Sequence, residues 1–364
     1  MQKIKNIEFL RIFLIITIVL FHMRVALNKI DCSIFHQMYK AFRWGSSSVE
    51  GFFIISGFFL VLTFKYKTTI LEFIKKKYAR LAPAAMFSVM VCGIASIFKI
   101  MKFKLIPNLA SGLLLCNFGK YWCRGSNVAL WYASALLFGL IVFFLILKYT
   151  KEKYHLTFFV LLAGGSFLLL SLLHGGVFNG YDKSILTNLL SVSTLRAIGG
   201  IGTGCVIAKL YQKYEGSIIN FIPNKWQFIL ISSLELLSLG FIFWWSYFRH
   251  ELINNIVYVL AFSVLFVCFL CGKSLLAQVT NKDIFTTLGK YSYSLFVIHI
   301  PIISIIKTTT LLHNKAFCAA HPFLIIQLLL LLTVFAAIIT YYLVEKPCYN
   351  YFMSLGQKSN SPMH

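Results

Sequence analysis

Long apolar runs separated by short polar segments are the dominant pattern of this chain. Apolar residues fill stretches such as 9–21, 129–147 and 323–343. With its flanks, each run reaches the roughly 20 residues that a helix needs to cross a bilayer. A helix satisfies its own backbone hydrogen bonds in lipid, so each run predicts a membrane-spanning helix. We therefore expect an all-α fold, a polytopic transmembrane bundle of about ten helices.

The predicted spans cover residues 7–27, 45–64, 80–100, 128–148, 156–174, 189–209, 227–248, 253–271, 288–309 and 322–344. Residues 109–118 are apolar but too short to cross a bilayer, so they predict a re-entrant or interfacial segment within the loop 101–127. No polar stretch is long enough for a soluble domain. We expect one transmembrane domain over residues 1–350 and a short cytoplasmic tail over residues 351–364.

Composition agrees with a membrane protein. The chain is 59% hydrophobic and 12% charged, whereas soluble domains are about a quarter charged. A net charge of +23 would suggest nucleic acid as a partner of a soluble protein. Here Lys and Arg lie in short loops, where they set topology and meet anionic headgroups, so no nucleic-acid partner is expected.

The basic cluster between the second and third spans sets the predicted orientation. It consists of Lys65, Lys67, Lys75, Lys76, Lys77 and Arg80. The positive-inside bias places this cluster in the cytoplasm, and an even number of spans places both termini there. We expect no signal peptide, because the first apolar run lacks a cleavage site and leads into a second span.

Cysteines predict neither a disulfide framework nor a metal site. The nine cysteines are dispersed, most of them within apolar runs. Cys268 and Cys271 have the CxxC spacing, but they lie on a predicted buried helix without a second pair. Packing therefore explains them better than metal or redox chemistry, and we expect no metal.

Ionisable residues inside the apolar spans are the candidate functional residues. A charge in a span costs a few kcal/mol and is kept mainly where it lines a cavity or has a partner. Five residues meet this description: Arg11, His22, Glu50, Arg196 and His299. Arg11 and His22 are separated by about three helical turns, so they project from nearly the same face, about 16 Å apart along the axis.

Each candidate also has an ordinary structural explanation. Arg11 can be a snorkelling residue, His22 a core histidine, and Glu50 an acid at the membrane interface. As a functional group, Glu50 near the external end of its span could orient the imidazole of His22. Arg196 begins a glycine-rich stretch that another helix or a ligand could approach closely.

Two further features point to a polar pocket with a basic entrance. Lys77 and Arg80 lie three residues apart and share a helix face at the cytoplasmic edge, which suits phosphate groups. Positive-inside topology explains the same charges equally well. His299 lies two residues before Pro301, which removes a backbone hydrogen bond and opens the helix locally.

Five motifs occur in order along the chain. They are the pair Arg11 and His22 after Glu8, VEGFFIISGF at 49–58, KYARLAP at 77–83, LWY at 130–132, and YSYSLF at 291–296 followed by His299 and Pro301. Together they resemble membrane acyltransferase family 3, the integral membrane enzymes that O-acylate bacterial polysaccharides and other glycans. Two differences stand out: Ala135 or its neighbours occupy a position where many members have glutamate, and no C-terminal hydrolase-like domain is expected.

The resemblance implies an acyl-CoA donor, most simply acetyl-CoA, on the cytoplasmic side of the bacterial inner membrane. It implies a glycan hydroxyl as acceptor, and either the bundle or partner proteins of glycan assembly complete the transfer. Histidine can take the hydroxyl proton near neutral pH, which makes His22 the expected base and Glu50 its partner. The remaining roles are cofactor binding for Arg11, Lys77 and Arg80, and substrate binding for His299, Arg196 and Trp131.

Two other functions stay open at this stage. A transporter or flippase of a lipid-linked glycan would also explain buried charges and many helices. Such proteins often have repeated halves with broken helices, which are not evident here. An acyltransferase for another acyl group, such as succinyl, or for a small molecule would have the same motifs.

Overall fold

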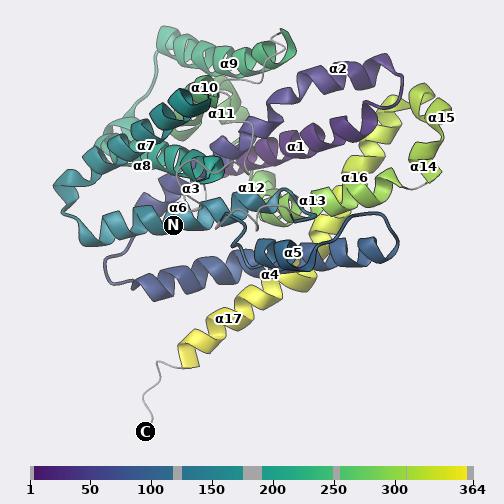
Figure 1. Cartoon of the computed structure of the whole chain (residues 1–364). Helices are drawn as coiled ribbons and strands as arrows, with labels where there is room; N and C mark the ends of the chain where they lie inside the picture. The colour runs from purple at the N-terminus through teal and green to yellow at the C-terminus, as the bar shows by residue number, and fades with distance from the viewer. Residues whose placement is uncertain (1–3, 118–124, 175–190, 249–254, 309, 359–364) are drawn as a thin grey trace. The chain divides into compact units, whose positions relative to one another are not determined.

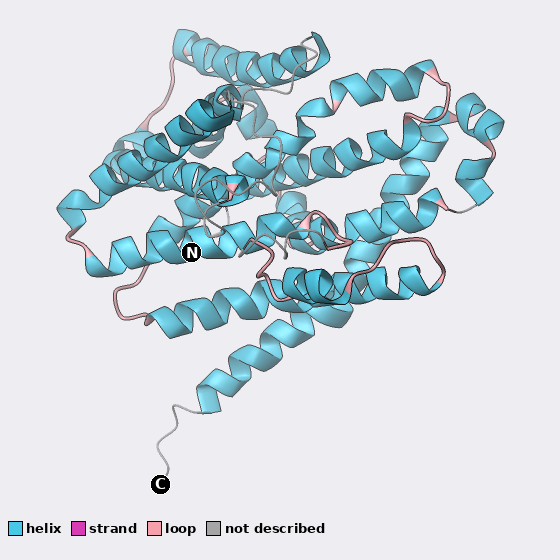
Figure 2. Ribbon diagram, viewed as in Figure 1, coloured by secondary structure: helices cyan, strands magenta, loops and turns pink. Residues whose placement is uncertain are grey.

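The computed structural model describes residues 4–117, 125–174, 191–248, 255–308 and 310–358. Within these ranges the chain forms helices joined by short loops, and no β-strand is present (Figure 2). This confirms the predicted all-α fold. Lys120 and Arg124, which the predicted topology places in the loop 101–127, lie outside the described residues.

Seventeen α-helices and two irregular helices follow one another in the described ranges (Figure 1). In chain order they are α1 (Lys5–Leu27), α2 (Ser33–Ala41), the 3-10 helix η1 (Arg43–Ser47), α3 (Ser48–Leu62), α4 (Ile70–Ile97), α5 (Leu105–Gly112), α6 (Leu130–Tyr149), α7 (Glu152–His174), α8 (Val192–Asn220), α9 (Lys225–Phe248), α10 (Asn255–Cys271), α11 (Leu275–Val279), α12 (Asp283–Gly289), α13 (Ser292–Lys307), α14 (Thr310–His313), α15 (Lys315–Ala320), α16 (Pro322–Thr340), the π-helix η2 (Tyr341–Glu345) and α17 (Lys346–Lys358).

The helices are those of a polytopic membrane protein. Among the described residues, seven helical segments are long and apolar enough to cross a membrane, and α12 with α13 makes an eighth if this bent pair is one span. The predicted spans 189–209 and 253–271 coincide with α8 and α10, which are not among these eight. The kind of fold is therefore confirmed, but the count of ten is not.

The helix that contains the third predicted span begins before the apolar run. Helix α4 starts at Ile70, whereas the predicted span starts at residue 80. The backbone N–H of Glu72 donates to Thr69 Oγ1 (3.2 Å), and the backbone N–H of Thr69 donates to Glu72 Oε2 (2.9 Å). This capping box satisfies two N–H groups at the helix start, so the helix extends through polar sequence. Lys77 and Arg80 consequently lie inside a helix rather than at its first turn.

The chain divides into two compact units. The first unit contains Met1–Phe64, Val142–Gly180 and Thr194–Ser292, and the second contains Lys65–Ile141, Tyr181–Ser193 and Tyr293–His364. We describe each unit separately.

An aromatic cluster forms part of the core of the first unit. There α1 packs against η1, α3 and α12. Trp44 of η1 is buried, and its ring lies 5.8 Å from that of Phe13, 5.2 Å from that of Phe243 and 6.1 Å from that of Tyr258. These contacts hold η1, and the α3 helix that follows it, against α1 and α10.

Polar contacts fix α13 within the second unit, where α4 packs against α5, η2 and α17. The Tyr293 hydroxyl donates to the carbonyl of Leu81 in α4 (2.6 Å). The Ser294 hydroxyl donates to Glu345 Oε2 in η2 (2.5 Å). Both hydroxyls are buried, and a buried hydroxyl without a hydrogen-bond partner would destabilise the fold. These two bonds therefore stabilise the position of α13.

Candidate active site

A buried ion pair joins two of the predicted site residues in the first unit. Arg196 Nε donates to Glu50 Oε1 at 2.6 Å, and the side chains are 6% and 0% exposed. Arg196 Nη2 also donates to the carbonyl of Ser46 in η1 (3.2 Å). One guanidinium therefore holds both η1 and the start of α3. Removal of one partner would leave an uncompensated buried charge, which costs about 3–5 kcal/mol.

Glycines allow α3 and α8 to approach closely enough for this pair to form. A Cβ atom on Gly204 would lie 1.9 Å from the carbonyl oxygen of Ile54, and one on Gly200 would lie 2.6 Å from Phe53 Cβ. Neither position can hold a side chain without movement of the backbone or of the neighbour. Gly200 and Gly204 of the stretch after Arg196 thus serve close helix packing, one of the two possibilities that the sequence leaves open, and the helix that approaches them is α3.

Hydroxyl groups lie in the same buried region as the ion pair. Thr17 Oγ1 of α1 and Ser48 Oγ of α3 share a hydrogen bond of 2.9 Å. Tyr258 of α10 is buried and lies close enough to Ser48 and Glu50 to interact with them electrostatically. Sequence reasoning missed Thr17, Ser48 and Tyr258, because hydroxyl residues are common in spans and carry no signal of position.

Arg11 is bound to protein groups on α1 and at the start of α13. Its Nη1 lies 3.0 Å from both carboxylate oxygens of Glu8, and its Nη2 donates to Ser292 Oγ (3.1 Å). The Arg11 side chain is 20% exposed and that of Glu8 is 8% exposed. Glu8, which is predicted only as part of a motif, is therefore the direct partner of Arg11.

His22 lies near the end of α1, on the helix face predicted to carry Arg11. Helix α1 is continuous from Lys5 to Leu27, so the predicted spacing of three turns applies. Leu14, Ile15 and Ile18, which lie between the two residues on that face, are all buried. The His22 ring is half-buried and packs edge-on against Phe21 at 4.9 Å. The face shared by Arg11 and His22 therefore points into protein.

The basic residues of α4 differ in exposure. Lys77 is half-buried, with its Nζ 5.4 Å from the centre of the Phe73 ring, and Arg80 is exposed. The helix confirms that the two residues are one turn apart on the same face. Their exposed part can meet a soluble anion.

His299 lies in the interior of the second unit. It is fully buried in α13, and its Nδ1 lies 2.6 Å from the carbonyl oxygen of Phe296. Since a carbonyl can only accept, Nδ1 carries the proton and Nε2 is the acceptor of the neutral ring. The Phe296 ring in turn packs against Tyr132 at 4.8 Å.

Asn127 replaces the backbone hydrogen bond that Pro301 removes from α13. Pro301 has no N–H, so the carbonyl of Val297, four residues earlier, loses its helical donor. Asn127 Nδ2 donates to that carbonyl at 2.7 Å and to Ser88 Oγ at 3.0 Å. Asn127 is absent from the predicted site residues, although an amide just before an apolar span is visible in the sequence.

Trp131 lies at the start of α6 and is half-buried. Its carbonyl accepts a hydrogen bond from Asn117 Nδ2 (3.0 Å), and Ser193 Oγ donates to Asn117 Oδ1 (3.1 Å). The backbone at Trp131 is thus held by two polar residues of the same unit.

The structure brings together Glu50 and Arg196, two of the predicted site residues. Oε1 of Glu50 accepts from Arg196, and the role of Glu50 in orienting His22 stays a prediction. The second unit holds Lys77, Arg80, Trp131 and His299. Among the described residues, no group of three or more His, Cys, Asp or Glu side chains is placed to hold a metal ion.

Comparison with known proteins gives relatives over nearly the whole chain. O-acetyltransferase OatA from the Staphylococcus aureus strains NCTC 8325 / PS 47, COL and MRSA252 is 25% identical over 389 residues in each case. The matched part is 95% of this chain and 57% of the relative, so the chain spans little more than half the length of these curated relatives. No solved structure matches the chain significantly.

A family model agrees with these relatives. The model described as Acyltransferase domain matches residues 4–342, a range that includes all the predicted site residues and parts of both compact units. The motifs around His22, Glu50 and Arg80 indicate the same family from the sequence. The chain therefore belongs to the membrane acyltransferase family 3.

Proposed function

We propose that this protein transfers an acyl group, most simply acetyl, from acyl-CoA to a hydroxyl of a cell-surface polysaccharide or lipid-linked glycan. The family match over residues 4–342 carries this proposal, and the relatives named O-acetyltransferase support acetyl as the group transferred. The donor binds from the cytoplasm at the inner membrane of a bacterial cell. The basic residues at positions 65–80, which lie just before α4 and in its first turns, support this orientation, with both termini in the cytoplasm.

His22 is the proposed general base. In the reaction, the acceptor hydroxyl attacks the thioester carbonyl, and His22 takes the hydroxyl proton as the new C–O bond forms. The C–S bond then breaks, and the proton passes to the sulfur of the departing coenzyme A. The half-buried position of the His22 ring supports this role, because a base must be reachable by substrate while bulk water is limited.

Lys77 and Arg80 are the proposed contacts to the phosphates of coenzyme A. They share one face of α4, and Arg80 is exposed enough to form charge-assisted hydrogen bonds with a phosphate. Arg11 is the weaker candidate, since a phosphate would have to replace Glu8, which lies 3.0 Å from the Arg11 guanidinium. We assign Arg11 mainly to holding α1 beside Ser292.

Glu50 and Arg196 are proposed to position the site rather than to react. The pair holds η1 and α3 to α8, and α3 packs on the helix that carries His22. In the second unit, the proposed contacts to the glycan that receives the acyl group are Trp131 and His299, whose Nε2 can accept a hydrogen bond from a sugar hydroxyl. Partner proteins of glycan assembly would supply that acceptor.

A cell-based acylation assay with matched histidine variants tests the proposal. His22→Ala should abolish acylation of surface glycans, measured by mass spectrometry, while the protein stays in the membrane. His36→Ala is the control, because His36 is exposed on α2. Full acylation by His22→Ala would refute the role of His22, and glycans that lack acyl groups with or without the wild-type gene would refute the function itself.

A further inference from the structure

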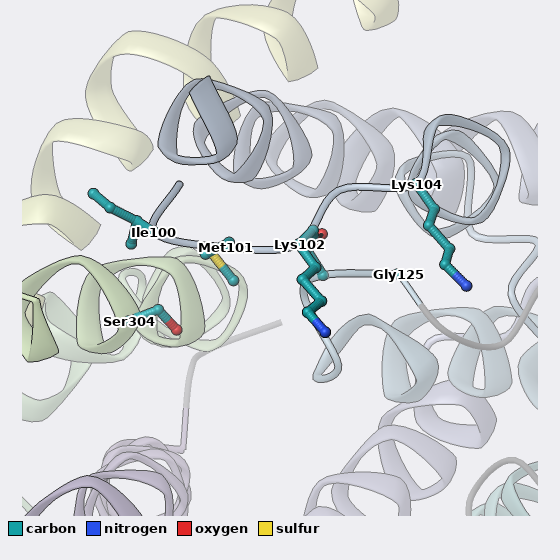
Figure 3. A pocket seen from close by; sticks show the side chains of 7 residues that line it. Ile100, Met101, Lys102, Lys104, Gly125 and Ser304 are labelled. Carbon is teal, nitrogen blue, oxygen red and sulfur yellow. Dashed lines mark hydrogen bonds between the residues drawn. The ribbon is translucent and has the colours of Figure 1, made fainter. Parts of the chain in front are cut away.

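A cavity of about 380 Å³ lies in the second unit, at the segment that follows α4. Its lining consists of Ile100, Met101, Lys102, Lys104, Gly125, Ser126 and Ser304 (Figure 3). The side chains of Lys102 and Lys104 extend in the same direction in Figure 3. None of these residues has a role in the proposed acyl transfer.

Hydrogen bonds fix the wall of this cavity. The Ser126 hydroxyl donates to the carbonyl of Lys102 (2.6 Å) and accepts from Asn108 Nδ2 (3.1 Å). The backbone N–H of Ser126 donates to Asn108 Oδ1 (2.9 Å). The segment that carries Lys102 is therefore tied to α5 by a buried amide, and the two lysines are presented from a defined backbone.

The chemistry of the lining favours an anion. Two ammonium groups and two serine hydroxyls line the cavity, and no carboxylate is among the lining residues. Lysine binds phosphate as a compact point charge, and the hydroxyl of Ser304 can add a hydrogen bond to a phosphate oxygen, whereas the hydroxyl of Ser126 already donates to the carbonyl of Lys102. The cavity is thus suited to a phosphate group.

The surface beside the cavity is apolar, and it faces outward. Helix α5 exposes Leu105 (62%) and Ile106 (67%), while it buries Asn108 and Ser111. The end of α4 likewise exposes Ile97 (76%). This pattern is the reverse of a water-facing helix, since the polar side is inside and the apolar side outside. Such a surface is suited to the hydrocarbon chains of lipid.

We propose that this cavity binds the anionic phosphate headgroup of a membrane lipid, with the lipid chains against the exposed apolar residues of α5 and the end of α4. Lys102 and Lys104 neutralise the headgroup phosphate. The apolar neighbours distinguish a lipid from a free phosphate ion, because only a lipid can use both surfaces. This site is separate from the proposed acyl transfer and does not depend on it.

Lipid binding to the purified full chain in detergent, measured by native mass spectrometry, tests the proposal. The probes are phosphatidylglycerol, a diacylglycerol with the same chains, and inorganic phosphate. We expect phosphatidylglycerol to bind more tightly than either of the other two. Lys102→Gln/Lys104→Gln should weaken its binding roughly 30-fold, since each lysine near an anionic lipid contributes a factor of about five.

Two further variants test whether the effect on lipid binding comes from the lysines of the cavity or from any loss of positive charge on the protein. Lys65→Gln/Lys67→Gln removes two exposed lysines with the same spacing outside the cavity and should weaken phosphatidylglycerol binding far less than Lys102→Gln/Lys104→Gln does. Lys102→Arg/Lys104→Arg keeps both charges and should retain binding. The melting temperature of each variant shows that it is folded.

Three results would overturn the proposal. The first is phosphatidylglycerol binding by Lys102→Gln/Lys104→Gln that equals wild type. The second is equal binding of diacylglycerol, which would remove the phosphate from the argument. The third is inorganic phosphate that binds as tightly as the lipid, which would make the cavity a site for a free anion.

Discussion

Asn127 donates a hydrogen bond of 2.7 Å from its side-chain amide to the main-chain carbonyl of Val297, 170 residues away in the sequence. That carbonyl is the one that Pro301 leaves without a helical donor. The Oδ1 atom of Asn127 also accepts from the backbone N–H of Ala129 (3.2 Å), just before α6. The Asn127 side chain therefore supplies the hydrogen bond that α13 lacks near His299, and it also holds the residues just before α6.

Asn127→Ala should destabilise the protein by about 1–3 kcal/mol, because a buried carbonyl loses its donor. Pro301→Ala restores a backbone N–H at residue 301, so Asn127→Ala should cost less in that background. Unfolding of the four proteins in detergent measures this double-mutant cycle. An equal cost of Asn127→Ala in both backgrounds would contradict the proposed exchange of donors.

Glu50→Leu and Arg196→Met should each destabilise the protein by about 3–5 kcal/mol, because each leaves a buried charge without its counter-ion. The double variant should recover much of this loss, since two apolar side chains can replace a buried ion pair. Denaturant unfolding of the single and double variants checks this.

The same variants test whether Glu50 only positions the site. We expect glycan acylation to return together with stability in the double variant. A stable double variant without acylation would instead give Glu50 a part in the chemistry.

Gly204→Ala should destabilise the protein by about 1–3 kcal/mol, because its Cβ atom would lie 1.9 Å from the carbonyl oxygen of Ile54. Gly216→Ala on the same helix is the matched control, as a Cβ atom there would have no heavy atom within 4 Å. That substitution should stabilise α8 by roughly 0.5–1 kcal/mol through helix propensity. Melting temperatures that fall equally in both variants would contradict the close packing of α3 and α8.

Arg80→Ala should weaken acetyl-CoA binding by about tenfold or more, the effect of one charge-assisted hydrogen bond to phosphate. Lys213→Ala, which removes an exposed charge from α8, should leave the affinity unchanged. Added salt should weaken binding to wild type more than to Arg80→Ala, because the contact is electrostatic and partly exposed. Calorimetry at two ionic strengths measures both effects, and an affinity that Arg80→Ala does not change would place the phosphate site elsewhere.

Local patterns in the sequence were enough for the class of fold and for several relations along one helix. Apolar runs of about 20 residues predict membrane helices because a helix alone satisfies its backbone in lipid. The shared face of Arg11 and His22, and that of Lys77 and Arg80, follow from helical periodicity and hold in α1 and α4. Hydropathy does not indicate where α4 begins, because the capping box of Thr69 and Glu72 lies in polar sequence before the apolar run.

The partners of the candidate residues could be known only from the tertiary structure. Glu50 and Arg196 are 146 residues apart, and either could have paired with any opposite charge that packing brought near. Periodicity relates residues within one helix, whereas these contacts depend on which helices meet and how closely. Thus the sequence by itself determined the membrane bundle, the family motifs and the faces of single helices. The fold decided that glycines bring α8 onto α3, that Arg196 holds Glu50, and that Asn127 supplies the donor that Pro301 lacks.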